Sequence, residues 1–247
     1  MGKTGMAEVL LTVAAVSKRF RGLKAVSEVS FAIEAGHIVA LIGPNGAGKT
    51  TVFNMIAGGC APDAGEIRFA GRRIDGLRPD EVCVAGVGRT FQLVRPFAGL
   101  SVLDNVVIGA LRRSPRIADA RRKAHLILER LGIAEKRGLS ASSLTLPDRK
   151  RLEVARALAT EPRLLLLDEV MAGLRPTETD RMVAVFRELN RETGLTILLI
   201  EHVMRAVMAL SREIHVLHHG ELIASGAPDE VVRHPAVLDC YLGEDAA

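Results

Sequence analysis

The sequence predicts an α/β protein with a parallel sheet, a small antiparallel β subdomain and an inserted helical subdomain. Three observations predict this class. Short apolar runs alternate with helical patterns in both halves of the chain, residues 8–33 alternate apolar and polar side chains, and residues 101–160 have a mostly helical pattern. Alternating strands and helices are typical of a parallel sheet covered by helices.

The N-terminal part should contain strands before its first helix. Residues 8–33 are expected to form two antiparallel strands joined by a turn near Arg21-Gly22. Ile38–Ile42 is a continuous apolar run, as in strands that are buried on both faces. A helix should open near Gly48 and end at Gly58-Gly59, because glycine favours helix C-termini.

The remaining elements follow from the same kinds of signal. Ser101, with Asp104 three residues later, resembles a capping box, which marks the start of a helix. Glycine or proline closes the later helices. In chain order, we expect a hairpin at Ile67–Ile74 broken by Gly71, helices at Arg116–Leu131 and Asp148–Thr160, a strand at Leu164–Leu167, a helix at Thr177–Glu192, a strand at Leu195–Ile200, a short helix from about Val203, a strand at Ile214–Leu217 and a hairpin turned at His219-Gly220.

Composition describes an ordinary globular protein and excludes several classes. Of the 247 residues, 48% are hydrophobic and 25% charged, which excludes a disordered chain. A net charge of +4, with seven Phe, one Tyr and no Trp, disfavours a dedicated nucleic-acid binder. The three cysteines Cys60, Cys83 and Cys240 have no paired spacing, which indicates a reducing compartment.

Membrane contact is expected only through a partner. No apolar run approaches the ~18–20 residues of a spanning helix, and Met1–Ala7 is not followed by the apolar core of a signal peptide. The basic stretch 112–123 is interpreted as a solvated helix face. Metal binding by His215, His218 and His219 is not expected, because two of them lie at a hairpin turn.

A glycine-rich segment after the first buried strand predicts phosphate binding. Gly43-Pro-Asn-Gly-Ala-Gly-Lys-Thr50 has P-loop spacing, with a strand before it and a helix after it. Glycines let successive N–H groups point at phosphates, and the helix N-terminus adds its positive end. Lys49 should reach the β- and γ-phosphates, and the Thr50 hydroxyl can ligate Mg²⁺.

Acidic and imidazole groups follow two later strands. Asp168 at the end of Leu164–Leu167 is suited to hold Mg²⁺ through water, and Glu169 to polarise an attacking water. His202 follows Leu195–Ile200, on the rim of the sheet where α/β proteins bind ligands. We therefore expect His202 to contact the γ-phosphate.

These motifs resemble the ATP-binding subunits of ABC transporters, over nearly the whole chain. Residues 43–51 resemble the family's Walker A sequence, and Leu164–Glu169 resembles Walker B with its catalytic glutamate. Gln92, in Gly88-Arg-Thr-Phe-Gln92, resembles the Q-loop glutamine, and His202 the switch histidine. The resemblance implies a P-loop NTPase core of the RecA-like type, formed by residues 1–91 and 162–247, with residues 92–161 as the helical subdomain.

The resemblance also implies roles for individual residues. Glu169, His202, Lys49 and Gln92 should be catalytic, and Thr50, Gln92 and Asp168 should hold Mg²⁺. Phe20 stands where the family stacks an aromatic ring on adenine, with a plain core phenylalanine as the alternative. The residues expected to bind ATP are Phe20, Gly43, Pro44, Asn45, Gly46, Ala47, Gly48, Lys49, Thr50, Thr51, Gln92 and His202.

Within the family, several short segments most resemble the branched-chain amino acid importer type. These segments are Arg89-Thr-Phe-Gln, Ala172-Gly-Leu, Ile200-Glu-His-Val-Met204 and Tyr241-Leu-Gly243. The resemblance implies an ATPase at the cytoplasmic face of the inner membrane, peripheral, bound to permease subunits and indirectly served by a solute-binding protein. The alternatives are a non-transport ATPase of DNA repair or translation, and a regulatory ATP-binding module with little turnover.

The chain departs from the family at its signature loop. The family's Leu-Ser-Gly-Gly-Gln is here Leu144-Thr-Leu-Pro-Asp148, and Arg175 stands where Asp or Asn is usual. Asp148 either brings a negative charge toward phosphate or caps the following helix. In the family this loop clamps ATP held by the opposite subunit. We therefore expect a heterodimer, rather than a homodimer, with a partner whose signature is intact.

Overall fold

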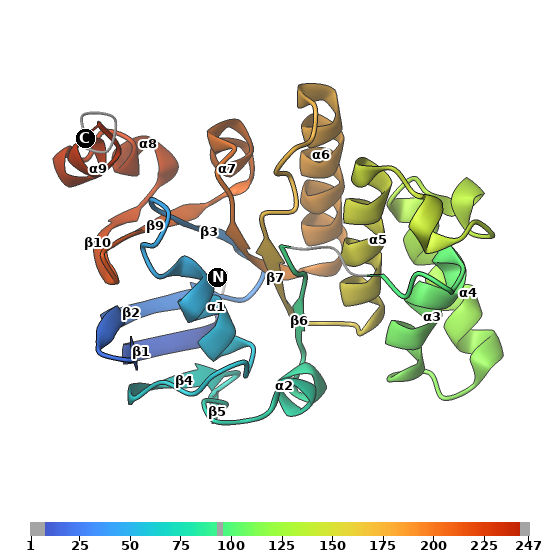
Figure 1. The fold of residues 1–247 in the computed structure, drawn as a ribbon, viewed down its shortest axis with the longest axis horizontal. Coiled ribbons are helices and arrows are strands. Elements are labelled where there is room, and N and C mark those ends of the chain that lie inside the picture. Colours follow the sequence, from blue (N-terminus) through green and yellow to red (C-terminus); the bar gives the residue numbers. More distant parts are fainter. Residues whose placement is uncertain (1–7, 93–95, 243–247) are drawn as a thin grey trace, which may run out of the picture.

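The computed structural model describes residues 8–92 and 96–242, which form two sheets and a helical block (Figure 1). Gly243 and the segment Met1–Ala7, considered above, lie outside the described residues. The strands and helices are, in chain order, β1 (Val9–Phe20), β2 (Leu23–Glu34), β3 (Ile38–Ile42), α1 (Lys49–Ile56), β4 (Ala64–Phe69), β5 (Arg72–Arg73), α2 (Pro79–Ala85), β6 (Val87–Arg89), α3 (Val102–Leu111), α4 (Ile117–Arg130), α5 (Leu146–Ala159), β7 (Leu164–Asp168), α6 (Pro176–Thr193), β8 (Thr196–Ile200), α7 (Met204–Leu210), β9 (Glu213–His218), β10 (Glu221–Gly226), α8 (Pro228–Val231) and α9 (Pro235–Leu242).

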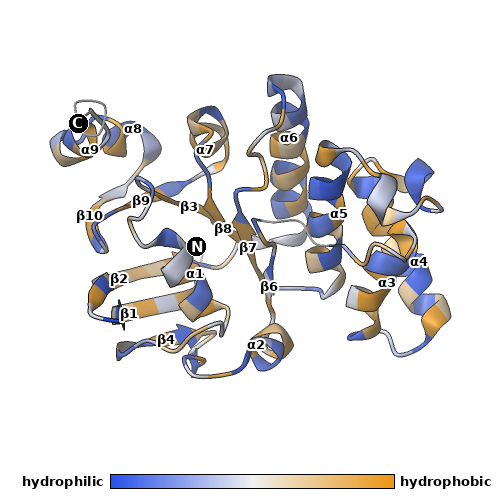
Figure 2. Cartoon of the chain, in the orientation of Figure 1, coloured by the Kyte–Doolittle hydropathy of each residue, from blue (hydrophilic) through white to orange (hydrophobic). Residues whose placement is uncertain are grey.

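The larger sheet carries the parallel strands and has the order β10-β9-β3-β8-β7-β6. Strands β9, β3, β8, β7 and β6 are parallel neighbours, and β10 is antiparallel to β9. All five residues of β3, of β7 and of β8 are buried. Because side chains alternate between the faces of a strand, these strands are apolar on both sides (Figure 2).

The two faces of this sheet pack against different parts of the chain. Leu165 and Leu167 of β7 join a core that includes helices α3 to α6, whereas Leu164 and Leu166 join a core with α1 and the smaller sheet. The smaller sheet is antiparallel, in the order β2-β1-β4-β5. In Figure 1 it lies at the opposite end of the molecule from the block of α3, α4 and α5.

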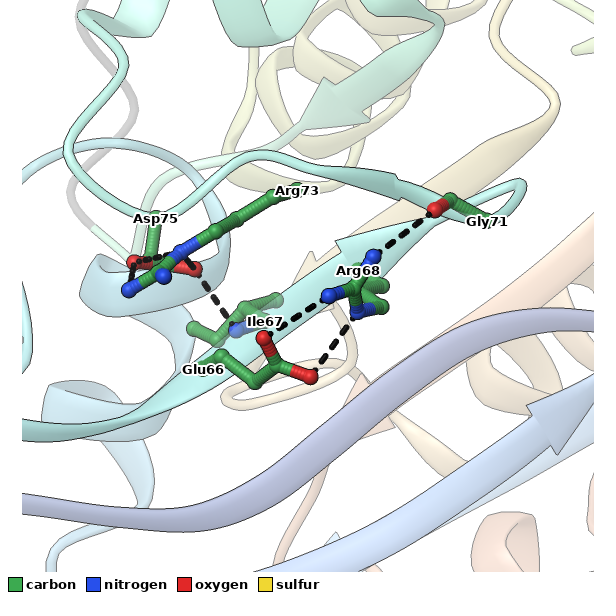
Figure 3. Close-up of polar contacts among 6 residues, drawn as sticks. All are labelled: Glu66, Ile67, Arg68, Gly71, Arg73 and Asp75. Carbon is green, nitrogen blue, oxygen red and sulfur yellow. Dashed lines mark hydrogen bonds and ion pairs between the residues drawn. The ribbon is translucent and has the colours of Figure 1, made fainter.

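The β4–β5 hairpin is stabilised by its own charged side chains (Figure 3). Asp75 Oδ1 accepts a hydrogen bond from the backbone N–H of Ile67 at 2.8 Å and another from Arg73 Nε at 3.0 Å. Arg68 forms two hydrogen bonds with the Glu66 carboxylate, at 2.8 and 3.0 Å. The turn between these strands contains Gly71 with φ +76°, a conformation that favours glycine.

The predicted α/β class with its antiparallel and helical parts is confirmed. The two N-terminal strands, the buried strand before the glycine-rich loop and the capping of α3 also agree, since Ser101 Oγ accepts from the N–H of Asp104. Helix α5 begins at Leu146, two residues earlier than expected, with Thr145 as its N-cap and Pro147 in its first turn. Sequence patterns did not predict α2, β6, α8 or α9, which are short.

A buried histidine lies where the two sheets face each other. The ring of His215, on β9, stacks on Phe31 of β2 at 4.8 Å, and its Nδ1 lies 2.8 Å from Ser225 Oγ. His215 is 2% exposed, and its Nε2 has no hydrogen-bond partner among the described residues. Burial lowers the pKa of His215 to about 4, because a charged ring would lose its hydration there.

The lowered pKa of His215 predicts acid sensitivity of the fold. In the unfolded chain His215 has an ordinary pKa near 6.5 and becomes protonated as the pH falls below that value. In the folded chain its ring stays neutral until the pH approaches 4. Between pH 6.5 and 4 the stability of the wild type should therefore fall relative to that of His215→Gln, by on the order of 1 kcal/mol per pH unit. Chemical denaturation of both proteins across this range measures the difference. Parallel pH dependences would show that the pKa of His215 is the same in the folded and unfolded states, and would contradict the lowered value.

Candidate functional site

The glycine-rich loop connects β3 to α1 at the centre of the parallel sheet. A Cβ at Gly43, where φ is +144°, would lie 2.0 Å from the carbonyl oxygen of Leu217. A Cβ at Gly48, where φ is +102°, would lie 2.5 Å from the carbonyl oxygen of Ala25. Only glycine fits at these two positions, so the path of the loop depends on them.

The loop borders a cavity of about 370 Å³. Lys49, the first residue of α1, is 6% exposed, and its Nζ donates to the carbonyls of Gly43 at 2.6 Å and Pro44 at 2.7 Å. The ammonium group is thus held inside the loop, at the N-terminal end of a helix. The cavity is lined by Leu23, Lys24, Ala25, Asn45, Gly46, Ala47, Gly48, Lys49, Thr50, Thr51, Gln92, Glu169 and His219.

Three side chains from different elements meet beside this cavity. Glu169 follows β7, and its Oε2 accepts from Gln92 Nε2 at 2.8 Å. Its other oxygen, Oε1, lies 3.0 Å from Nε2 of His202, which follows β8. The structure therefore brings Glu169, Gln92 and His202 together. For Glu169 and His202 the positions after predicted strands indicate this, whereas Gln92 was expected there only from the family resemblance.

Asp168 is buried behind the cavity and does not line it. Its Oδ2 accepts from the Arg89 guanidinium at 3.1 Å, and the same guanidinium donates to Asn54 Oδ1 of α1 at 2.7 Å. Burial raises the pKa of Asp168, although the hydrogen bond and charge of Arg89 lower it. Sequence reasoning quoted Arg89 only as part of a resemblance and missed its contact with Asp168.

Phe20 and His219 complete the surroundings of the cavity. Phe20, at the end of β1, is 46% exposed, so the alternative of a plain core phenylalanine is wrong. Its strand partner Leu23 lines the cavity, whereas Phe20 itself does not. His219, in the β9–β10 turn, lines the cavity and was not predicted; its place beside a turn glycine at the sheet edge was the available signal.

The altered signature loop is organised within the chain. Asp148 Oδ2 accepts from Lys136 Nζ at 2.5 Å and from the Thr145 hydroxyl at 2.7 Å. Burial alone would raise the pKa of Asp148, but the hydrogen bonds from Lys136 and Thr145 hold it below its usual value. The expectation that Asp148 caps the helix is wrong, because Thr145 is the N-cap. The Asp148 carboxylate is instead buried and paired within the chain.

Two other residues of this region also differ from the family pattern. Leu146, in place of the first signature glycine, is 42% exposed. Arg175 is the N-cap residue of α6, and its guanidinium donates to Glu178 Oε1 at 2.9 Å. A neighbouring subunit that approached this face would therefore meet an apolar side chain and a guanidinium.

A second cavity, of about 430 Å³, lies between the sheet and the helical block. Phe91, Phe97 and Ile108 line it and are each more than 40% exposed. Arg89 also lines it, so one side chain reaches both this groove and Asp168. None of the helices in the described part of the chain combines the length and hydrophobicity that crossing a membrane requires.

Comparison with known proteins identifies relatives over nearly the whole chain. A family model described as "ABC transporter" matches residues 26–172, and one described as "Branched-chain amino acid ATP-binding cassette transporter" matches residues 221–247. The high-affinity branched-chain amino acid transport ATP-binding proteins LivG of Salmonella typhimurium and BraF of Pseudomonas aeruginosa are each 40% identical, over 97% of this chain and 100% of theirs. The lipopolysaccharide export system ATP-binding protein LptB of Escherichia coli is 36% identical, over 95% of this chain and 98% of its own.

Solved structures share the fold at full length. The crystal structure of a nucleotide-free ATP-binding cassette from an ABC transporter superposes with a TM-score of 0.87, at 30% identity, over 94% of this chain and 98% of that one. The ADP conformation of an ATP-binding cassette of an ABC transporter gives 0.86, also at 30% identity, over 95% and 99%. The chain therefore belongs to the ABC transporter ATP-binding family, whose members hydrolyse ATP to power transport.

Proposed function

We propose that this chain is the ATP-hydrolysing subunit of a membrane importer for branched-chain amino acids or related small amides. The proposal rests mainly on one observation: Lys49, Glu169 and His202 all lie at the same edge of the sheet. The names of the full-length relatives and the match at residues 221–247 support the substrate class. They favour this function over a non-transport ATPase or a regulatory module.

ATP would occupy the 370 Å³ cavity, with its phosphates on the loop formed by residues 43–51. The backbone N–H groups and the Lys49 ammonium would hold the phosphates, and the exposed ring of Phe20 would stack on adenine. Glu169 would orient the attacking water and accept its proton, while Lys49 and His202 would stabilise the charge that develops on the transferred phosphoryl group.

The oxygen donors near the cavity fit Mg²⁺. Thr50 and Gln92 line the cavity and offer hydroxyl and amide oxygens. Asp168 precedes Glu169, which also lines the cavity, but its carboxylate is buried and paired with Arg89. Oxygen ligands with retained water are the set that Mg²⁺ prefers, so Asp168 would act through water. When bound, Mg²⁺ would neutralise charge on the phosphate oxygens.

The proposed partners are permease subunits and a second ATP-binding subunit. The groove lined by Phe91, Phe97 and Ile108 would receive a cytoplasmic segment of the permease. The chain would then lie peripherally at the cytoplasmic face of the inner membrane. Residues 92–161 would move as the helical subdomain against the core of residues 1–91 and 162–247. A solute-binding protein would deliver the cargo without contacting this chain.

The second ATP-binding subunit would carry an intact signature, because this chain's own loop has lost its phosphate donors. The Thr145 hydroxyl donates to Asp148 within the chain, Leu146 has replaced a glycine and Pro147 has no N–H. In a homodimer both sites would contain this loop. In a heterodimer the ATP held by residues 43–51 would be completed by the partner's loop.

Removing the carboxylate of Glu169 should strongly slow ATP hydrolysis and leave ATP binding unchanged. Glu169→Gln keeps hydrogen-bonding groups for Gln92 and His202 but cannot accept a proton from water. We expect unchanged ATP affinity and turnover reduced by on the order of 10²–10³ in the affinity-purified transporter. Nucleotide titration and phosphate release measure the two quantities. Near-normal hydrolysis would remove Glu169 from this role.

Removing the ammonium of Lys49 should abolish nucleotide binding. Lys49→Ala deletes a charged donor to the phosphates, and hydrogen bonds to charged groups contribute ~1.5–3 kcal/mol each. Titration with a fluorescent ATP analogue measures the loss, and Lys123→Ala, in the helical block, is the matched control. Thermal unfolding checks that the loop, which Lys49 also holds together, still folds. Unchanged affinity would refute the phosphate site.

The altered signature predicts that the purified chain alone hydrolyses ATP slowly. Addition of a second subunit carrying Leu-Ser-Gly-Gly-Gln should raise the rate, because it completes the site on residues 43–51. Glu169→Gln in this chain should then remove most of the gain, whereas the equivalent change in the partner should not. Cooperative hydrolysis by the chain alone, at the rate of the assembled transporter, would contradict the heterodimer.

A further inference from the structure

A buried lysine of the helical block contacts the backbone of Glu169. Lys150, in the first half of α5, is 6% exposed, and its Nζ donates to the carbonyl oxygen of Glu169 at 2.8 Å. Lys150 does not line the nucleotide cavity. It therefore acts on a different atom of Glu169 than Gln92 and His202, which contact the carboxylate.

The backbone of Glu169 needs such support. Its φ is +51°, a left-handed conformation that residues other than glycine adopt only where the surrounding structure holds them. The N–H of Glu169 donates to the carbonyl of Ile200 at 2.9 Å, and the N–H of Met171 donates to Glu201 Oε1 at 2.8 Å. The Glu169 carbonyl accepts from the N–H of Ala172 at 3.3 Å and, at the shorter distance of 2.8 Å, from the Lys150 ammonium. Of these contacts on the turn, that of Lys150 comes from the helical block.

Burial of the charged Lys150 ammonium costs desolvation free energy in this position. Burial lowers the pKa of Lys150, opposed by the carboxylates of Glu201, Glu169 and Asp168. Glu201 is 1% exposed, its Oε2 has no hydrogen-bond partner in the described part of the chain, and burial raises its pKa to about 7. An apolar side chain of similar volume would pack without this desolvation cost, so packing alone does not account for an ammonium group here.

We propose that Lys150 is a positioning residue for hydrolysis: by holding the Glu169 carbonyl, it fixes the direction of the Glu169 carboxylate and ties it to α5. Helix α5 begins at the altered signature loop, so a displacement of that loop would reach Glu169 through one side chain. This inference rests on the proposed role of Glu169. It concerns the geometry of hydrolysis and not the binding of ATP.

The first experiment compares three variants of this chain in the affinity-purified transporter. Lys150→Met removes the donor at similar volume, Lys150→Arg keeps a donor, and Lys123→Met removes a lysine that pairs with Glu161 elsewhere in the helical block. We expect Lys150→Met to lower kcat by on the order of 10–100-fold with KM for ATP and nucleotide affinity unchanged. Lys150→Arg should recover most of kcat, and Lys123→Met should match the wild type.

Loss of a buried charge could also unfold the chain, so a second variant separates the two effects. Lys150→Met combined with Glu201→Gln removes both buried charges while an amide oxygen remains for the Met171 N–H. This double variant should have a wild-type unfolding temperature and still show the low kcat. Wild-type kcat in a folded double variant would overturn the proposal.

A double-mutant cycle distinguishes positioning from a general structural role. If Lys150 acts through Glu169, Lys150→Met should not lower the residual turnover of Glu169→Gln any further, because the effects of residues that act together are not additive. Additive losses would overturn the proposal. Normal turnover of Glu169→Gln alone would refute the proposed function of Glu169, whereas a slow Glu169→Gln with a fast Lys150→Met would refute only the role of Lys150.

Discussion

The parallel register of β3, β8 and β7 is the constraint on which the candidate site depends. Ala40 pairs with Leu199, and Leu199 also pairs with Leu167, so the three strands end at one edge. The glycine-rich loop, the acidic pair 168–169 and residues 201–202 leave the sheet at that edge. Apolar burial on both faces fixes this register, since a slip by one residue would change the face on which every side chain lies. The side chains of the site come from distant parts of the sequence, and they lie close together because the apolar core permits one alignment of these strands.

Much of the fold was predictable because its signals are local. A five-residue apolar run is too short for most helices and is typical of a strand that is buried on both faces. Glycines at 43 and 48 mark a loop whose backbone tolerates no Cβ. The hydroxyl and carboxylate of Ser101 and Asp104 likewise mark the start of α3. Helix α2 and strand β6 were missed since seven- and three-residue elements carry too little periodicity. Strand β6 pairs with β7, and α2 packs against β6, so both elements depend on contacts that the sequence does not display.

The candidate site was predictable in its strand-end residues and less so in the residues behind them. Lys49, Glu169 and His202 follow apolar strands, so topology alone brings them together. The residues behind the site contact it through hydrogen bonds from other elements: Arg89, Lys150 and Glu201. No spacing rule in the sequence links such a charged side chain to its partner in a distant segment. Asp148 was misjudged for the same reason, because its partner Lys136 lies in a separate segment. A charged residue on an apolar helix face was the one available signal for Lys150.

The adjacent acids Asp168 and Glu169 are held by cations that come from different elements. Arg89 reaches Asp168 from β6 and also lines the groove between sheet and helical block, whereas Lys150 reaches Glu169 from α5. A segment bound in the groove would contact the element that holds Asp168. A displacement of the signature helix would act on the element that holds Glu169. Both contacts are at least partly buried, so water and salt screen them less than they screen exposed pairs. In the proposed assembly, the permease segment would therefore act on Arg89 and the second ATP-binding subunit on Lys150, while the sheet that supports both acids stays in place.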